Sequence, residues 1–116
     1  GNTVVIDFVG NVGTLAFDTT LVKLATNYGF DYVDDSGNTI TAVNITGTAQ
    51  VTITLSGNVG ANPFVSYAYH NGDGGAANQV SGDGDRGNLR DSDTAVSLYN
   101  GARLYNWCVI FREPVA

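Results

Sequence analysis

The sequence predicts an all-β domain built as a two-sheet β-sandwich. From Gln50 to Ser56, apolar residues alternate with threonine and serine, which is the pattern of a strand with one face in a core and the other in water. Several short runs of this kind are separated by turn clusters of glycine, asparagine and aspartate, and such spacing is typical of sandwiches. The only helix candidate, Thr19 to Ala25, is short and contains residues of low helix propensity.

The expected strands follow the chain from one turn cluster to the next. They are Thr3 to Val9, Thr14 to Phe17, Leu21 to Ala25 (or one helical turn), Tyr28 to Val33, Thr39 to Thr46, Gln50 to Ser56, Phe64 to His70 and Leu104 to Arg112. A turn cluster covers Asp34 to Asn38, and a hairpin is expected around Gly47. Pro63 precedes a strand, where its missing N–H is tolerated. The preferred arrangement is immunoglobulin-like or fibronectin-like, with a jelly roll as the alternative.

The last expected strand is apolar on both faces. Trp107, Val109 and Phe111 share one face, and Cys108, Ile110 and Arg112 share the other. Because Arg112 is difficult to bury, we expect the Trp107 face to point to the core and the preceding long connection to cover Cys108 and Ile110. Cys108 is the only cysteine, so no disulfide can form within the chain, and an inert buried thiol is expected.

Composition limits the function classes. The chain has 116 residues, enough for a single domain covering 1–116, and a net charge of −6 with only five lysines and arginines. Nucleic acid and anionic lipid are therefore poor partners, because both attract cationic proteins. No apolar run is long enough to span a membrane, and no signal peptide is visible. The absence of methionine predicts that the sequence is a fragment of a longer protein.

The segment from Asn71 to Arg103 is expected to carry the function. It shows no helical or strand periodicity, and such long connections in small domains are usually functional or disordered. It holds five of the eleven acidic residues and three of the five basic ones. Arg86 and Arg90 are predicted to clamp carboxylates within the segment. In the alternative interpretation, Asn88, Arg90 and Asp93 present planar polar groups to sugar hydroxyls.

Metal binding and catalysis are less well supported. Asp83, Asp85, Asp91 and Asp93 offer the oxygen ligands that calcium prefers, but the position where a calcium loop has glutamate is Thr94. We therefore expect no cofactor, with calcium as the alternative. His70, the only histidine, has no nucleophile motif near it, so we expect no enzymatic activity. The glycine-rich stretches lack the lysine and helix of a phosphate loop.

Aromatic residues lie near both ends of the long segment. They are Tyr67, Tyr69, Tyr99, Tyr105 and Trp107. Carbohydrate sites use aromatic faces against sugar rings, together with a few polar groups. Tyr69 and Tyr99 are the better candidates, because Trp107 on an apolar strand face is expected to belong to the core.

Two stretches, RGNLRDSD at 86–93 and LYNWCVIF at 104–111, are the most distinctive parts of a resemblance that covers about Asp18 to Val115. The chain resembles the C-terminal β-sandwich module found with sialate O-acetylesterase-like (SGNH-type) hydrolases and with phage tail and tailspike proteins. The resemblance implies a non-catalytic module that accompanies a carbohydrate-active domain, outside the cell or on a virion.

The sequence thus predicts a monomeric, carbohydrate-binding accessory module of an extracellular or phage-borne protein. Its partners would be a glycan and a neighbouring catalytic or virion domain. The expected site comprises Tyr69, His70, Asn88, Arg90, Asp93 and Tyr99. The alternative is a structural or interaction domain of a phage particle, at a tail tip or as capsid decoration. That alternative predicts an exposed apolar patch and a symmetric oligomer.

Overall fold

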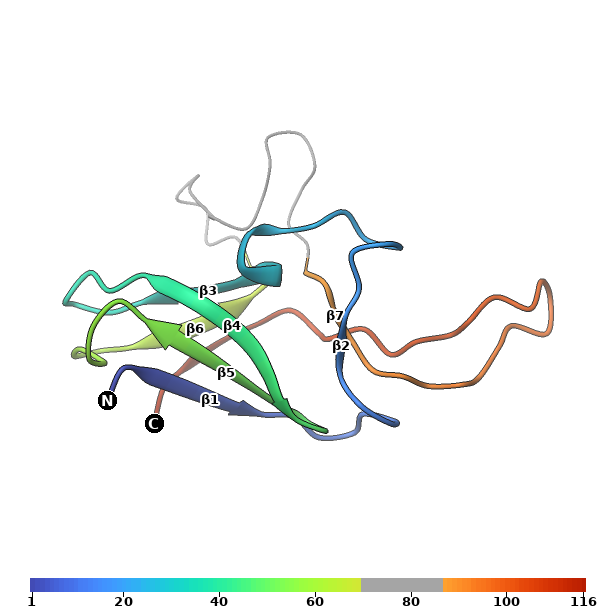
Figure 1. Ribbon diagram of the computed structural model, residues 1–116, viewed down its shortest axis with the longest axis horizontal. Helices are drawn as coiled ribbons and strands as arrows, with labels where there is room; N and C mark the ends of the chain where they lie inside the picture. Colours follow the sequence, from blue (N-terminus) through green and yellow to red (C-terminus); the bar gives the residue numbers. More distant parts are fainter. Residues whose placement is uncertain (70–86) are drawn as a thin grey trace.

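The computed structural model describes residues 1–69 and 87–116, which form a β-rich fold (Figure 1). Its elements are β1 (Thr3–Asp7), β2 (Ala16–Phe17), the 3₁₀ turn η1 (Thr26–Gly29), β3 (Phe30–Val33), β4 (Ile40–Gly47), β5 (Gln50–Leu55), β6 (Phe64–Tyr67), β7 (Leu89–Arg90) and β8 (Phe111–Pro114). They form three small antiparallel sheets, β1-β5-β4, β3-β6-β8 and β2-β7. Within the described ranges, no helix is long and apolar enough to cross a membrane.

The expected hairpin is confirmed, because β4 and β5 pair as neighbours on either side of the turn at 48–49. The alternation in β5 is confirmed as well. Val51, Ile53 and Leu55 are buried, whereas Gln50, Thr52 and Thr54 between them are partly exposed. The local pattern thus decides which face of this central strand enters the core.

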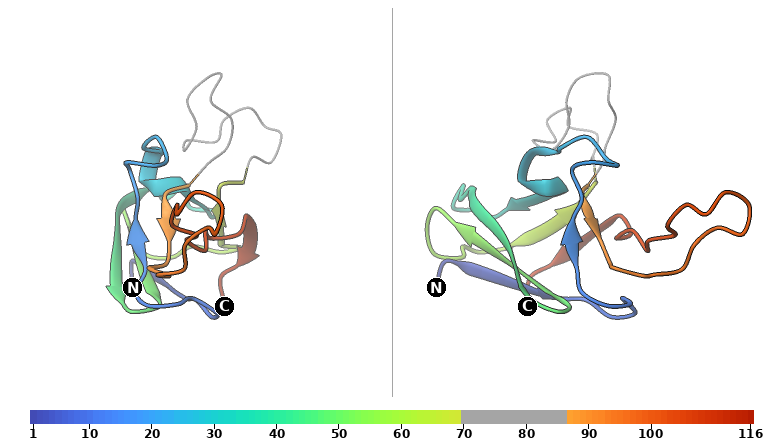
Figure 2. Two further views of the ribbon diagram at one scale, coloured as in Figure 1. Left: turned by 90° about the vertical axis from the view of Figure 1, so that its right-hand side faces the viewer. Right: turned by 45° about the vertical axis from the view of Figure 1, so that its right-hand side comes forward.

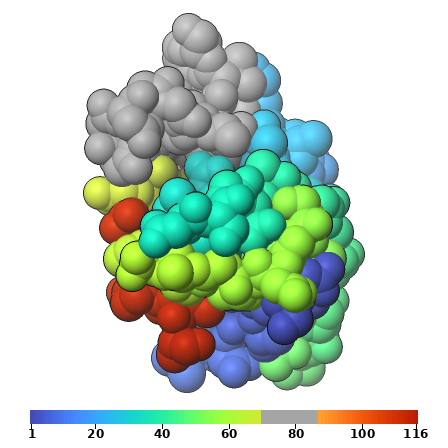
Figure 3. Space-filling model, turned by 90° about the vertical axis from the view of Figure 1, so that its left-hand side faces the viewer, coloured from blue at the N-terminus to red at the C-terminus, as the bar shows by residue number. Residues whose placement is uncertain are grey.

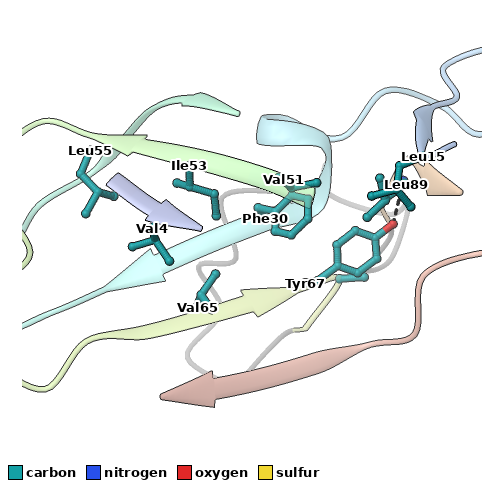
Figure 4. Packing of buried hydrophobic residues seen from close by; sticks show 10 residues of the cluster. Val4, Leu15, Phe30, Val51, Ile53, Leu55, Val65, Tyr67 and Leu89 are labelled. Atoms are coloured by element: carbon teal, nitrogen blue, oxygen red, sulfur yellow. Dashed lines mark hydrogen bonds between the residues drawn. The ribbon is translucent and has the colours of Figure 1, made fainter. Parts of the chain in front are cut away.

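Both three-stranded sheets contribute residues to the core (Figure 4). Its buried apolar residues are Val4, Leu15, Phe30, Val51, Ile53, Leu55, Val65, Tyr67, Ala68 and Leu89. The ring centroids of Phe30 and Tyr67 are 5.0 Å apart at its centre. The Tyr67 hydroxyl accepts a hydrogen bond of 2.9 Å from the N–H of Leu89, which ties β7 to this core (Figure 4).

The turn expected at Asp34 to Asn38 is organised by one buried carboxylate. Asp34 accepts hydrogen bonds from the N–H groups of Ser36, Asn38 and Gly60, the Asn38 side-chain amide and the Tyr32 hydroxyl. Burial acts to raise the pKa of Asp34, but these donors outweigh it and hold that pKa well below its usual range. Figure 3 shows this end of the molecule, where the chain around the turn lies close to the connection from β5 to β6.

The prediction for Leu21 to Ala25 was wrong in both of its forms, because these residues are neither strand nor helix. The Asp18 carboxylate accepts hydrogen bonds from the N–H groups of Thr20 and Leu21, so a side chain satisfies the backbone that a regular element would use. A 3₁₀ turn follows instead, with Tyr28 at a φ of 56° and its ring stacked on Phe17 at 4.0 Å.

The prediction for Leu104 to Arg112 was wrong in extent, because the strand is β8, and only part of the predicted face is inward. Phe111 packs against Phe30 and Tyr67 as expected, whereas Trp107 is 39% exposed rather than in the core. Cys108 packs against the core, and its N–H donates to the Leu89 carbonyl at 3.0 Å. The Cys108 thiol is half-buried, and burial raises its pKa to about 12, so it is not a reactive thiolate. Ile110 is uncovered, with 64% of its surface exposed.

Residues 92–110 form an arm that projects from the three sheets (Figures 1 and 2). Its two limbs are joined by backbone hydrogen bonds from Ser97 to Ala102 and from Leu104 to Ala95, and the turn lies at 98–101. The segment from Asn71 to Arg103 is therefore not one irregular connection, since part of it forms β7, the first limb of the arm, its turn and the start of the second limb. His70, Asp83, Asp85 and Arg86 lie outside the described residues.

Candidate functional site

Asp91 anchors the base of the arm. Its carboxylate is buried and accepts hydrogen bonds from the N–H groups of Val12 at 2.8 Å, Asn106 at 3.0 Å and Asp93 at 3.1 Å, and from the Asn106 side-chain amide at 2.7 Å. Burial acts to raise the pKa of Asp91, but these donors hold it well below its usual range. One charged side chain thus joins both limbs of the arm to the connection between β1 and β2.

Arg90 supports the arm from the other side of its base. Its Nε lies 2.7 Å from Oδ2 of Asp18, its Nη1 donates to the Asp91 carbonyl at 2.7 Å, and its guanidinium lies 3.7 Å from the centre of the Tyr105 ring. The pKa of Asp18 is lowered chiefly by the hydrogen bond from the Leu21 N–H, and the hydrogen bond from Arg90 is the next largest cause. The arginine clamp therefore exists, but the prediction that Arg90 holds an acid within its own segment was wrong, because its partner is Asp18.

Asn88 lies beneath the surface. Its amide oxygen accepts from the N–H of Ala25 at 2.9 Å, and its amide nitrogen donates to the carbonyls of Asp18, Val22 and Lys23. The side chain is fully buried, so all of its hydrogen-bonding capacity holds the connection that precedes η1. Asn88 is therefore a structural residue here and presents no group to a sugar.

The remaining predicted site residues are spread over the molecule. Tyr69 is half-buried just after β6, whereas Tyr99 lies in the turn of the arm and is 96% exposed. Asp93 lies at the arm base, where its carboxylate accepts from the Ala95 N–H and the Asn106 amide. The structure thus brings Arg90 and Asp93 to one place, and it leaves Tyr99 at the other end of the arm.

The arm carries an apolar surface that the sequence reasoning missed. Its exposed apolar residues are Val96, Leu98, Tyr99, Leu104, Trp107, Val109 and Ile110. Clusters of exposed apolar side chains mark interaction sites, whereas single scattered ones do not. A signal was present in the sequence, because a run that is apolar on both faces needs cover on both sides.

An open groove of about 970 Å³ runs between β1 and β8 to the base of the arm. Its apolar lining includes Val4, Ile6, Phe8, Phe111 and Val115, and the acidic residues Asp7 and Glu113 also line it. This volume is in the range of sites that accept ligands or peptide segments. The groove and the arm are two features of the described residues that could receive or offer a partner, and a smaller pocket of about 340 Å³ lies beside η1 and Val43.

The described residues contain no group of three or more histidine, cysteine, aspartate or glutamate side chains placed to hold a metal ion. Both oxygens of Asp91, one of the suggested calcium ligands, accept N–H donors instead. Comparisons of the chain with protein-family models, curated proteins and solved structures found no match.

Proposed function

We propose that this chain is a non-catalytic interaction domain that joins an extracellular or virion assembly through its arm. The observation that carries the proposal is the exposed apolar surface on a projecting hairpin, which would be costly to leave in water without a partner. The buried network of Arg90 and Asp91 fixes the base of the arm, so the arm is held in one direction rather than trailing as a linker.

The supporting scaffold in this proposal is a β-sandwich, with β1-β5-β4 and β3-β6-β8 as its two sheets. Burial of core residues from both sheets supports an immunoglobulin-like or fibronectin-like arrangement. The resemblance of 86–93 and 104–111 to modules of phage tail proteins and SGNH-type hydrolases supports a location outside the cell or on a virion.

Sedimentation velocity over a range of protein concentrations tests the proposal. We expect the wild-type chain to associate, and we expect the double variant Leu98→Ser/Val109→Ser to stay monomeric, because both side chains are exposed on the arm. Leu21→Ser is the matched control, since it removes an exposed leucine outside the arm. If the wild type remains monomeric at every concentration, or if the arm variant associates equally well, the arm is not an interaction surface.

Glycan binding is the second candidate, and the arm base supplies the observation that favours it. Tyr105 and Trp107 meet edge to face with ring centroids 6.5 Å apart, and Arg103 reaches the Tyr105 ring beside Arg90. Aromatic faces beside guanidinium groups are suited to sugar rings and their hydroxyls. In this proposal the site retains Arg90 and Asp93, adds Tyr105 and Trp107, and omits the buried Asn88 and Tyr99 in the turn of the arm.

A glycan array followed by titration of the best ligand tests this second candidate. We expect dissociation constants on the order of micromolar to millimolar, which correspond to about 4–8 kcal/mol. Trp107→Ala and Arg90→Ala should weaken binding, with Leu21→Ala as the control. Absence of binding at millimolar concentration, or equal binding by both variants, rejects the glycan site.

A further inference from the structure

The outer edge of β1 offers unpaired backbone groups. In the antiparallel pairing with β5, the Leu55 N–H donates to the Asn2 carbonyl, and the Phe8 N–H donates to the Ala49 carbonyl. Backbone groups alternate in direction along such a strand, so Thr3, Val5 and Asp7 direct their N–H and C=O groups away from β5. No described strand pairs with that side of β1. This row of groups can accept one further strand.

The opposite wall of the groove is less suited to pairing. The Val115 N–H donates to the Pro63 carbonyl, so in β8 the backbone groups of Arg112 and Pro114 point outward. Pro114 has no N–H to donate. An added strand would therefore pair with β1 and pack its side chains against the apolar lining of the groove. Asp7, Asp91 and Glu113 also line the groove, where Arg90 is already paired with Asp18, so a segment that carries negative charge is disfavoured.

The arm has the properties that this groove requires. It is an extended hairpin with exposed apolar side chains, and its only charged residue between 94 and 110 is Arg103, although the whole chain has a charge of −6. Val96 and Arg103 form a bridge flanked by hydrogen bonds at Ser97 and Leu104. In that geometry Val96 directs its own N–H and C=O outward, so the limb at 94–98 has a free edge.

We propose that the arm of one copy occupies the groove of a second copy, with residues 94–98 adding as a strand to β1. The inference rests on the proposed function and names the partner as another copy of this chain. Residues 94–98 do not line the groove, whereas residues 106–109 at the arm base do, so each copy can donate the outer segment of its arm and accept another copy's segment in its groove. Such contacts are heterologous and generate a ring or a filament.

A complementation experiment tests the proposal. Val5→Pro removes an outward N–H of β1 without touching the bonds to β5, and its exposed side chain leaves the core unchanged. The double variant Val96→Asp/Leu98→Asp makes the arm incompatible with an acidic apolar groove.

We expect each variant alone to be monomeric in sedimentation velocity. Their mixture should form a 1:1 dimer that cannot grow, because one variant retains only a working arm and the other only a working groove. Val5→Thr is the control and should associate as the wild type does.

Amide hydrogen exchange tests the same contact without a substitution in β1. We expect the Val5 and Asp7 amides to be protected in the wild-type assembly and to exchange freely in the arm variant. If Val5→Pro folds and associates like the wild type, or if Val5 and Asp7 exchange freely in an assembly, the groove is not the acceptor, although association through the arm still stands. If the wild type does not associate at all, the proposed function fails together with this inference.

Discussion

Buried polar side chains hold the connections of this domain at the scale of single residues. Asp18, Asp34, Asn88 and Asp91 are all buried, and each satisfies backbone groups of a segment that belongs to no sheet. Since an unpaired buried polar group is costly, such residues fix a connection in one conformation. Where the chain has no regular structure, these side chains supply the hydrogen bonds that a neighbouring strand would otherwise supply.

Asp91 should make stability depend on acid. Its folded pKa is lowered, so its contribution is present above the ordinary carboxyl value near 3.9 and is lost as the pH falls below that value. Asp91→Asn should lower the free energy of unfolding by about 2–4 kcal/mol at neutral pH, because an amide cannot accept all four donors. As the pH falls from neutral to 2, the melting temperature of the variant should fall less than that of the wild type. Asp35→Asn, on an exposed carboxylate, is the control, and equal loss in both would contradict the role of Asp91.

Gly87 is required where the chain passes close to the core. A methyl group added at this position would collide with the ring of Tyr67, whose hydroxyl holds Leu89. We expect Gly87→Ala to destabilise the fold by about 1–3 kcal/mol in chemical denaturation. Gly47→Ala is the control, because its added methyl would make an ordinary contact with Gln50. An unchanged midpoint for Gly87→Ala would show that the ring can move aside.

Local patterns predicted the elements that depend on local contacts. Alternation in β5 identified both its strand and its buried face, since each side chain reports its own side of the sheet. The run from 104 to 111 was ambiguous because it is apolar on both sides, and its contacts are with distant residues, such as Phe111 with Phe30 and the Cys108 N–H with the Leu89 carbonyl. Asn88 looked like an exposed loop residue because its partners lie 63 to 70 residues earlier in the chain.

The β2-β7 pair is expected to depend on Arg90. Arg90→Ala removes the partner of the buried Asp18 carboxylate and the support of Tyr105, so the free energy of unfolding should fall by about 1–3 kcal/mol. Limited proteolysis should also cut the arm base sooner. Arg112→Ala provides the comparison, because among the described residues that exposed guanidinium covers the Phe64 ring and should matter less. If the two variants are equally stable and equally resistant, the clamp contributes nothing.

For the whole molecule, the arm is separable from the body. Residues 94–104 contribute nothing to the core, whereas the base contributes Cys108 and depends on the contacts of Asp91 with Asn106. Replacing residues 94–104 with a short Gly-Asn turn should therefore leave the melting temperature within a few degrees of the wild type and abolish association. Extending the deletion through Asn106 is the matched variant and should lower the melting temperature. A large loss in the shorter deletion would show that the arm stabilises the body.

The contacts that fasten the arm base also affect how fast the chain acquires its structure. Val12 meets Asp91 across 79 residues and Asp18 meets Arg90 across 72, so long stretches must close before these bonds form. The β4-β5 hairpin closes over a few residues and should form early. The other strand pairings join distant parts of the chain, so refolding of the whole domain should take milliseconds to seconds. In stopped-flow experiments, Arg90→Ala should accelerate unfolding and leave the refolding rate almost unchanged. A slowed refolding rate would instead place the 18–90 contact in the nucleus, and the chain would have to close a loop of 72 residues first.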